Sequence, residues 1–251
     1  MKVRQGVRGT DLGGRARVRS WGDGNGVVQL VLTDQAVVPG AEELDDWLHA
    51  ATEAGDGVHT VRTGALFPDA AACFGGAGFT VVDSLALLEL TFGAATATPG
   101  ATPVTARTGS LPARRHQEAA TIDRRAFGSS WAHDGDDLAE IRTATPHHVA
   151  RGRYLGGRFE RGPLVAFAIT GAASGQGYLQ RLAVDPTYQC GGHGRALTLD
   201  SLAWMRRRRL RSALVNTSVD NTPALALYHS VGFQRRPETL LVMQLAVRAQ
   251  Q

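Results

Sequence analysis

Apolar and polar positions along the chain follow two alternating periods, which predicts strands and helices in succession. A strand-like apolar stretch runs over 178–184 and stops at Asp185-Pro186. The next apolar positions recur at helical spacing: Ala196, Leu199, Leu202 and Ala203. A helix is therefore expected to begin near His193 or Gly194. The segment predicts a strand, a turn and a glycine-rich helix start.

The turn itself, QCGGHG at 189–194, has the composition of an anion site. The first amide N–H groups of a helix have no partners within it, and the helix dipole places partial positive charge there. Glycines allow the backbone to approach a ligand closely, so the pattern favours a phosphate group at this position. A turn that only needs flexible residues is the alternative. The order of the glycines matches neither a Walker A loop nor G-x-G-x-x-G.

A helix, a glycine and a strand recur in both halves of the chain. Thr222-Pro223 is predicted to open the second of these helices, with threonine as N-cap, and Gly232 follows its end. In the first half, Phe74 and Gly78 take the places of Tyr228 and Gly232. The correspondence over about 30 residues favours a duplication. The first copy is incomplete, and it has no counterpart of the QCGGHG turn.

The composition is that of a folded protein, with 251 residues of which 43% are hydrophobic and 20% charged. Residues 93–103 are small, polar and proline-containing, which predicts a linker. We therefore expect an incomplete domain at 1–92, the linker, and a complete domain at 104–251. Cys73 and Cys190 are the only cysteines, which favours a reducing cytoplasm.

The net charge is +4, and Lys2 is the only lysine, so arginine carries nearly all of the positive charge. The densest cluster, MRRRRLR at 205–211, falls at a predicted helix end, where the dipole favours cations. No aromatic residues lie between these arginines, so a solvated helix end is favoured over a nucleic-acid surface. No apolar run has the length of a membrane span, and the N-terminus lacks the apolar core of a secretory signal. These features predict a cytoplasmic protein that binds neither a membrane nor nucleic acid.

Three segments, taken in order, resemble motifs of the GCN5-related N-acetyltransferase (GNAT) superfamily over about 104–247. LQRLAVDP at 179–186 resembles the family's splayed central strand. QCGGHG fits the pyrophosphate loop Q/R-x-x-G-x-G/A. NTPALALYHSVGF at 221–233 fits the helix-strand segment N-x-x-A-x-x-L-Y-x-x-x-G-F. Each motif alone has limited specificity, whereas all three in this order and at these spacings are specific.

The resemblance implies an α/β fold, with a mixed, mostly antiparallel sheet that is flanked by helices and splayed at 178–184. It implies acetyl-CoA as the acetyl donor, without a metal. The residues that it assigns to acetyl-CoA are Leu182, Ala183, Val184, Gln189, Cys190, Gly191, Gly192, His193, Gly194, Arg195 and Asn221. It assigns to Tyr228 the protonation of the departing CoA thiolate. The alternative role for Tyr228 is a core aromatic on an apolar helix face.

The general base is not evident from the sequence. In the family's ribosomal-protein N-terminal acetyltransferases, a glutamate stands at the position of Asn216, and asparagine cannot take a proton. His133, Asp134 and Glu140 are candidates near the expected acceptor loop, although each also suits an ordinary surface role. An α-amine has a pKa of about 7.7–8.0, so a sizeable neutral fraction can react without a base.

The activity that the resemblance implies is acetyl transfer from acetyl-CoA to a primary amine, by direct attack without a covalent enzyme intermediate. The acceptor is expected to be a small molecule or a peptide N-terminus. Two alternatives stay open. One is a tandem acetyltransferase similar to mycothiol synthase, which also joins a degenerate copy to an active one. The other is a non-catalytic, regulatory acyl-CoA-binding module.

Overall fold

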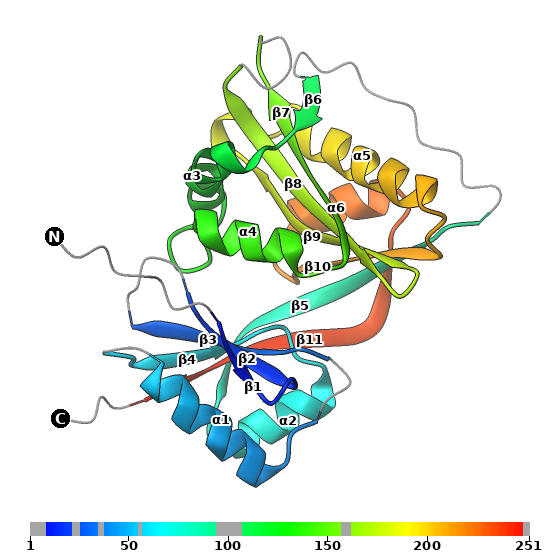
Figure 1. The fold of residues 1–251 in the computed structure, drawn as a ribbon. Coiled ribbons are helices and arrows are strands. Elements are labelled where there is room, and N and C mark those ends of the chain that lie inside the picture. Colours follow the sequence, from blue (N-terminus) through cyan, green and yellow to red (C-terminus); the bar gives the residue numbers. More distant parts are fainter. Residues whose placement is uncertain are drawn as a thin grey trace, which may run out of the picture. The chain divides into compact units, whose positions relative to one another are not determined.

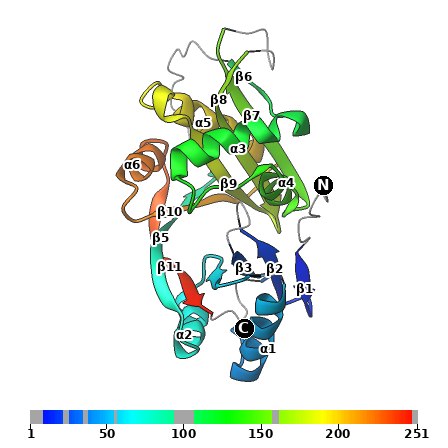
Figure 2. The same ribbon diagram turned by 90° about the vertical axis from the view of Figure 1, so that its left-hand side faces the viewer.

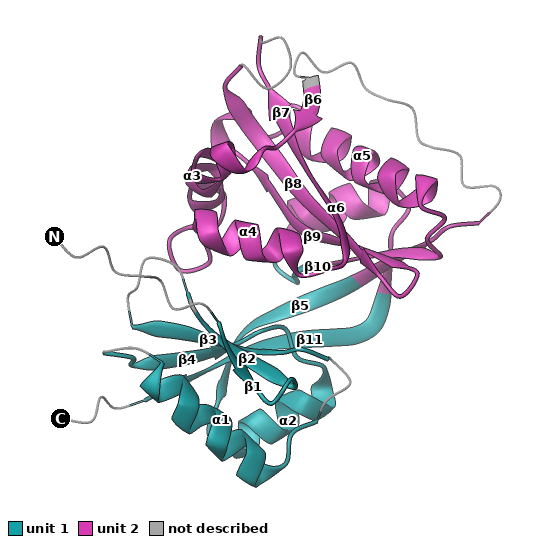
Figure 3. Ribbon diagram, viewed as in Figure 1, with its two compact units in different colours: residues 1–87, 217–220, 236–251 teal, residues 88–216, 221–235 magenta. Residues whose placement is uncertain are grey.

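The structure is a computed structural model that describes residues 9–21, 26–34, 38–54, 57–93, 107–156 and 162–247. The chain forms two compact units (Figure 3). The first unit comprises residues 1–87, 217–220 and 236–251, and the second comprises residues 88–216 and 221–235. The predicted parts, 1–92 and 104–251, follow a different boundary, because the last strand of the chain contributes to the first unit. The predicted linker lies outside the described residues except for Gly93.

Three strands run from one unit into the other: β5 (Thr80–Thr91), β10 (Ser212–Ser218) and β11 (Gln234–Ala246). The remaining elements of the first unit are β1 (Thr10–Leu12), β2 (Ala16–Ser20), β3 (Val27–Leu32), α1 (Ala41–Glu53), β4 (Thr60–Thr63) and α2 (Pro68–Gly76). Its strands lie in the order β1-β2-β3-β4-β11-β5 (Figure 1). The pair β3–β4 is parallel, and the pairs β1–β2, β2–β3 and β4–β11 are antiparallel.

One apolar core holds the first unit together. Leu44 and Trp47 of α1 and Phe74 of α2 pack with Leu30 of β3 and Met243 of β11. Each of these side chains is at most 5% exposed. Because burial of apolar surface drives folding, the residues of β11 contribute to the stability of a unit that begins more than 200 residues earlier in the chain.

The second unit contains the predicted strand and glycine-rich turn. Its further elements are β6 (Arg107–Ser110), η1 (Ala113–Arg115), α3 (His116–Phe127), α4 (Gly135–Thr143), β7 (His147–Tyr154), β8 (Leu164–Ala173), β9 (Gln176–Val184), η3 (Pro186–Tyr188), α5 (His193–Arg207) and α6 (Thr222–Ser230). Its strand order is β5-β10-β9-β8-β7-β6. The ladder from β6 to β9 is antiparallel, and β9 pairs with β10 in parallel.

Helices cover both faces of this part of the sheet. Figure 2 shows α3 and α4 in front of the strands and α5 behind them. Successive residues of β8 serve the two faces: Ile169 joins the core under α3, while the Thr170 hydroxyl donates to Ser201 Oγ of α5 over 2.8 Å. This alternation is the period-two pattern of a strand buried on both faces. The predicted α/β fold, a mixed and mostly antiparallel sheet flanked by helices, is confirmed.

The predicted correspondence between the two halves has a geometric counterpart. Both halves of the chain contain the order β-α-β-α-β, as β3-α1-β4-α2-β5 and as β9-α5-β10-α6-β11. After α2, the Phe79 amide donates to the Phe74 carbonyl over 3.1 Å, and the rings are edge-to-face with centroids 5.1 Å apart. After α6, Phe233 makes the same bond to Tyr228 over 3.0 Å, with centroids 5.8 Å apart.

The start of α6 differs from the prediction. Asn221, not Thr222, is the N-cap, because its side-chain oxygen accepts a hydrogen bond from the Ala224 amide over 3.2 Å. Asparagine is at least as good an N-cap as threonine, so the pattern allowed either position. Gly232 does follow the helix end as predicted, with a φ of +100° that favours glycine.

Candidate active site

The strands β9 and β10 separate at the point where a ligand is expected. Their parallel pairing covers only Gln176–Tyr178 against Ser212–Leu214, although β9 continues to Val184. On its other edge, β9 stays paired with β8, and a register shift leaves Gln180 without an opposite residue. The edge of Leu182–Val184 that faces away from β8 therefore has no ladder partner among the described strands. An extended ligand can add to such an edge through backbone hydrogen bonds.

The glycine-rich turn follows β9 directly and leads into α5. Cys190 and Gly192 have positive φ angles of 59° and 75°, and Gly192 is the N-cap. The helix begins at His193, as predicted, and the Ala196 amide donates to the Gly192 carbonyl over 3.0 Å. The amides that precede Ala196 in the first turn cannot find acceptors within the helix, and the dipole makes this end positive. These are the features of a phosphate site.

Two of the glycines lie close to neighbouring side chains in the fold. A Cβ atom on Gly191 would lie 3.1 Å from the His193 ring, and one on Gly194 would lie 3.2 Å from Leu227 Cδ2 of α6. Both distances are tighter than ordinary contacts. The turn therefore packs closely against neighbouring side chains. Because glycines have no Cβ atoms, a ligand can also approach its backbone closely.

The side chain of His193 is not presented to a ligand. Its ring is 5% exposed and stands edge-to-face to Tyr188 at 6.4 Å. Burial, and then the positive charge of Arg153, lower the pKa of His193 below its usual value. The neutral imidazole packs beneath the turn, so any contribution of His193 to an anion site comes through its backbone amide.

Tyr228 lies in the core at the end of α6, with 5% of its surface exposed. Burial raises the pKa of its phenol well above the usual value, and the nearby charge of Arg181 opposes this shift. The phenol therefore stays protonated throughout the neutral range and can donate a hydrogen bond there. Asn221 fixes the start of the same helix; its predicted contact with acetyl-CoA remains a prediction.

An ion pair that sequence reasoning missed ties β9 to α3 and, through two further hydrogen bonds, to the segment after α3. Arg181 Nε and Nη2 donate to the two carboxylate oxygens of Asp123 over 2.7 and 2.6 Å. Nη2 also donates to the Trp131 carbonyl over 3.0 Å, and the His133 amide donates to Asp123 Oδ2 over 2.8 Å. The guanidinium lies 3.8 Å from the centroid of the Phe127 ring. The signal in the sequence was an aspartate on the apolar face of a helix.

The candidate bases have structural partners. Asp134 caps α4, accepting from the Asp136 and Asp137 amides over 2.9 and 2.8 Å. His133 is buried, with Nδ1 at 3.5 Å from Asp137 Oδ2, and Glu140 lies on the exposed face of α4. Asn216 is exposed on β10. The assignment of a base stays a prediction.

Comparison with known proteins places this site in a family. The profile described as the Acetyltransferase (GNAT) family matches residues 116–233. The [ribosomal protein bS18]-alanine N-acetyltransferase of Escherichia coli K12 is 32% identical over 127 residues, which cover 50% of this chain and 76% of that protein. The chain belongs to the GNAT family. Both the matching profile and this relative carry the name of an acetyltransferase.

Other relatives match a smaller share of their own length. The mycothiol acetyltransferase of Saccharomonospora viridis is 34% identical over 125 residues, 47% of this chain but only 38% of that protein. A tandem GNAT protein from the clavulanic acid biosynthesis pathway has the same fold, with a TM-score of 0.65 at 14% identity over 94% of this chain and 79% of that chain. A GCN5-related N-acetyltransferase from Kribbella flavida has the same fold, with a TM-score of 0.60 at 16% sequence identity. That comparison covers 95% of this chain and 89% of the other.

Two features are absent from the described residues. No helix in the described ranges combines the length and the apolar character that a membrane crossing needs. In the same part of the chain, histidine, cysteine and acidic side chains form no group of three that could bind a metal ion.

Proposed function

We propose that this GNAT protein transfers the acetyl group of acetyl-CoA to a primary amine, at a site in its second unit. The observation that supports this most strongly is the sequence of features along one path: the splayed edge of β9, the glycine-rich turn and the N-terminus of α5. An extended strand edge that ends at a positive helix terminus suits a ligand with an amide-containing arm and a pyrophosphate.

The donor supplies an activated acyl thioester, and the chain's residues hold it. The backbone of Leu182, Ala183 and Val184 would bond the amides of the pantetheine arm. The amides from Cys190 to Arg195, with Gln189 before them, would bind the pyrophosphate. Asn221 would lie near the pantetheine arm. Its side-chain oxygen caps α6, so its side-chain NH₂ group would face the arm.

Tyr228 would donate a hydrogen bond to the sulfur of the leaving group as negative charge develops there. Because its pKa is raised, a complete proton transfer to a thiolate is uphill, and the donor role is stronger than the acid role. Arg181 counteracts part of the rise. The acceptor amine attacks directly, and water or one of His133, Asp134 and Glu140 removes its proton.

The first unit supports a second candidate, a tandem acetyltransferase with one degenerate copy. Its α1 occupies the place of α5, and Gly40 is its N-cap, but Glu42 and Glu43 stand in the first turn. Carboxylates at a helix N-terminus oppose a phosphate. The proposed parts are thus 1–92 as an incomplete GNAT-like copy, 93–103 as a linker, and 104–251 as the acting domain. The reading as a regulatory binding module is disfavoured by the presence of both Tyr228 and the complete turn.

The decisive experiment separates the acceptor classes. The protein is incubated with isotope-labelled acetyl-CoA and, in parallel, with a pool of peptides that have free N-termini or a pool of small amines and amino sugars. Label in one pool, identified by mass spectrometry, assigns the acceptor to a peptide or to a small molecule. Binding of acetyl-CoA with no labelled product in either pool would contradict the transfer reaction and support the binding module. Recovery in a cytosolic fraction would test the predicted location.

A further inference from the structure

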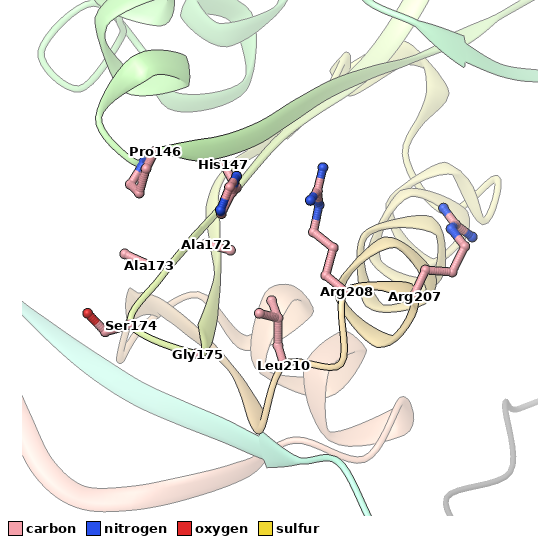
Figure 4. Close-up of a pocket in the computed structure, with 9 residues that line it drawn as sticks. All are labelled: Pro146, His147, Ala172, Ala173, Ser174, Gly175, Arg207, Arg208 and Leu210. Atoms are coloured by element: carbon pink, nitrogen blue, oxygen red, sulfur yellow. The ribbon is translucent and has the colours of Figure 1, made fainter.

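A cavity of about 410 Å³ lies at the other end of α5 from the glycine-rich turn (Figure 4). It is bounded by the start of β7, the turn between β8 and β9, and the C-terminal end of α5. Among its lining residues are His147, Ala172, Ala173, Arg207, Arg208 and Leu210. The volume falls in the range of small-molecule sites, roughly 300–1,000 Å³.

The charge of this lining is one-sided. Arg207, Arg208 and His147 contribute the ionisable side chains, and no carboxylate is among the lining residues. Within the described part of the chain, neither arginine has an ion pair; Asp200, further back on α5, is engaged by Arg151 at 3.1 Å. The helix dipole explains why cations stand at the end of α5. It does not explain why they border a cavity with an apolar floor.

The walls of the cavity are held in place by contacts outside it. The Arg208 guanidinium stacks 4.5 Å from the centroid of the Trp204 ring. Arg211 fixes the turn between β8 and β9, because its Nη2 donates to the Ser174 carbonyl over 2.8 Å and its amide donates to the Gly175 carbonyl over 2.8 Å. A site whose walls are already ordered loses less entropy when a ligand binds.

We propose that this cavity binds a small organic anion, with its anionic group on Arg208, whose guanidinium lies on the side of His147, whereas that of Arg207 points away (Figure 4). A planar guanidinium pairs well with phosphate, sulfonate or carboxylate groups, which is the chemistry that the uncompensated Arg208 selects. The apolar surface of Ala172, Ala173 and Leu210 suits a compact apolar body on the same molecule. The ligand class is therefore a monoanionic or dianionic group attached to a small hydrophobic moiety. The site does not depend on the acetyl transfer proposed above.

Phenyl phosphate is the probe for this site, titrated by calorimetry into the full chain, with Trp204 fluorescence as a second readout. A ligand of this size is expected to bind with a Kd of about 1 mM or tighter. Arg208→Gln should weaken binding at least about tenfold, since it removes one charge-assisted contact. Ala173→Phe, which fills the cavity without changing charge, should abolish it. Arg209→Gln is the matched control: it removes one charge from the same arginine run outside the lining, so its Kd should stay within about twofold of wild type.

Three results would overturn the proposal. The first is no binding of phenyl phosphate by the wild type at 10 mM, about ten times the expected Kd. The second is equal weakening by Arg209→Gln and Arg208→Gln, which indicates diffuse attraction to the arginine run. The third is loss of binding in Gly192→Asp, which would place the probe at the turn before α5. Thermal unfolding of each variant shows whether Ala173→Phe is folded, and Arg208→Gln, an exposed position, carries the test if it is not.

Discussion

Arg181 of β9 and Asp123 of α3 are joined by two parallel hydrogen bonds, and the carboxylate is completely buried. The pair fastens the segment between α3 and α4 to the strand whose other residues are proposed to hold acetyl-CoA. Since the Trp131 carbonyl and the His133 amide bond to the same two side chains, the segment has one defined path across the strand.

Replacing the carboxylate tests this arrangement. Asp123→Asn leaves Arg181 charged and poorly paired, because an amide accepts only one of the two bonds and cannot balance the charge. The free energy of unfolding should fall by about 3 kcal/mol, as for other broken buried pairs. Urea denaturation measures the change. Arg236→Gln, which breaks an exposed pair with Glu238, should leave the midpoint essentially unchanged. Equal, small effects of both variants would show that the buried pair adds little.

A negative charge at the N-cap of α5 should exclude acetyl-CoA. Gly192→Asp should lower its affinity about 100-fold or more, because the carboxylate repels the pyrophosphate at close range. Gly192→Asn has nearly the same size and tolerance for positive φ, so it should retain much more affinity. Gly40→Asp changes the N-cap glycine of α1 and should have no effect on binding. Calorimetry compares the three; equal losses in the Asn and Asp variants would point to backbone strain rather than charge.

One acetyl-CoA should bind per chain. The first unit has no glycine-rich turn, and Glu43 at the start of its α1 pairs with Arg15 over 2.8 Å. Anions are therefore excluded from the start of α1, because the carboxylates there are negatively charged and the nearby cation, Arg15, is already paired with Glu43. Calorimetry with a protein concentration fixed by amino-acid analysis gives the stoichiometry, and a value of two would contradict the assignment of the first unit as degenerate.

Removing the Tyr228 hydroxyl should slow the chemical step. Tyr228→Phe keeps the ring packing on Phe233 but removes the donor, so single-turnover rates should fall about 10²–10³-fold while acetyl-CoA affinity changes little. Tyr154→Phe is the control, since that phenol bonds the Ser110 carbonyl over 2.7 Å. It should cost about 1 kcal/mol of stability and leave the rate intact. A Tyr228→Phe enzyme with the wild-type single-turnover rate would remove this residue from the reaction.

The same phenol should make stability depend on alkaline pH. The pKa of Tyr228 is raised in the folded state. The contribution of its neutral phenol to the free energy of unfolding is therefore fully present below the pKa of tyrosine in the unfolded chain, about 10. Above that pH the unfolded chain loses its proton more readily than the folded chain, and stability declines. The urea concentration at the unfolding midpoint of the wild type should therefore decrease as the pH is raised above about 10. In Tyr228→Phe this midpoint should decrease less steeply with pH. Burial also raises the pKa of Tyr178, so this residue accounts for part of the pH dependence that remains in Tyr228→Phe.

The features that sequence analysis predicted correctly are local ones. The strand that becomes β9, the turn after it and the start of α5 at His193 follow from periodicity and glycine placement within about 25 residues. The Asn221 cap was missed because two adjacent residues were both good caps. The Arg181–Asp123 pair joins residues 58 positions apart, and burial of the His193 ring depends on Tyr188 and Arg153. No local pattern specifies such partners.

The pairing of β11 with β4 has a consequence for how the chain is made. Gln244 lies opposite Arg62, and Met243 belongs to the core of the first unit. A ribosome that has completed only the first half of this chain therefore exposes a sheet whose neighbouring strand has not yet been synthesised. The edge of β4 stays unpaired until residues about 180 positions later have been synthesised. During that part of translation a chaperone or another nascent chain can bind this edge.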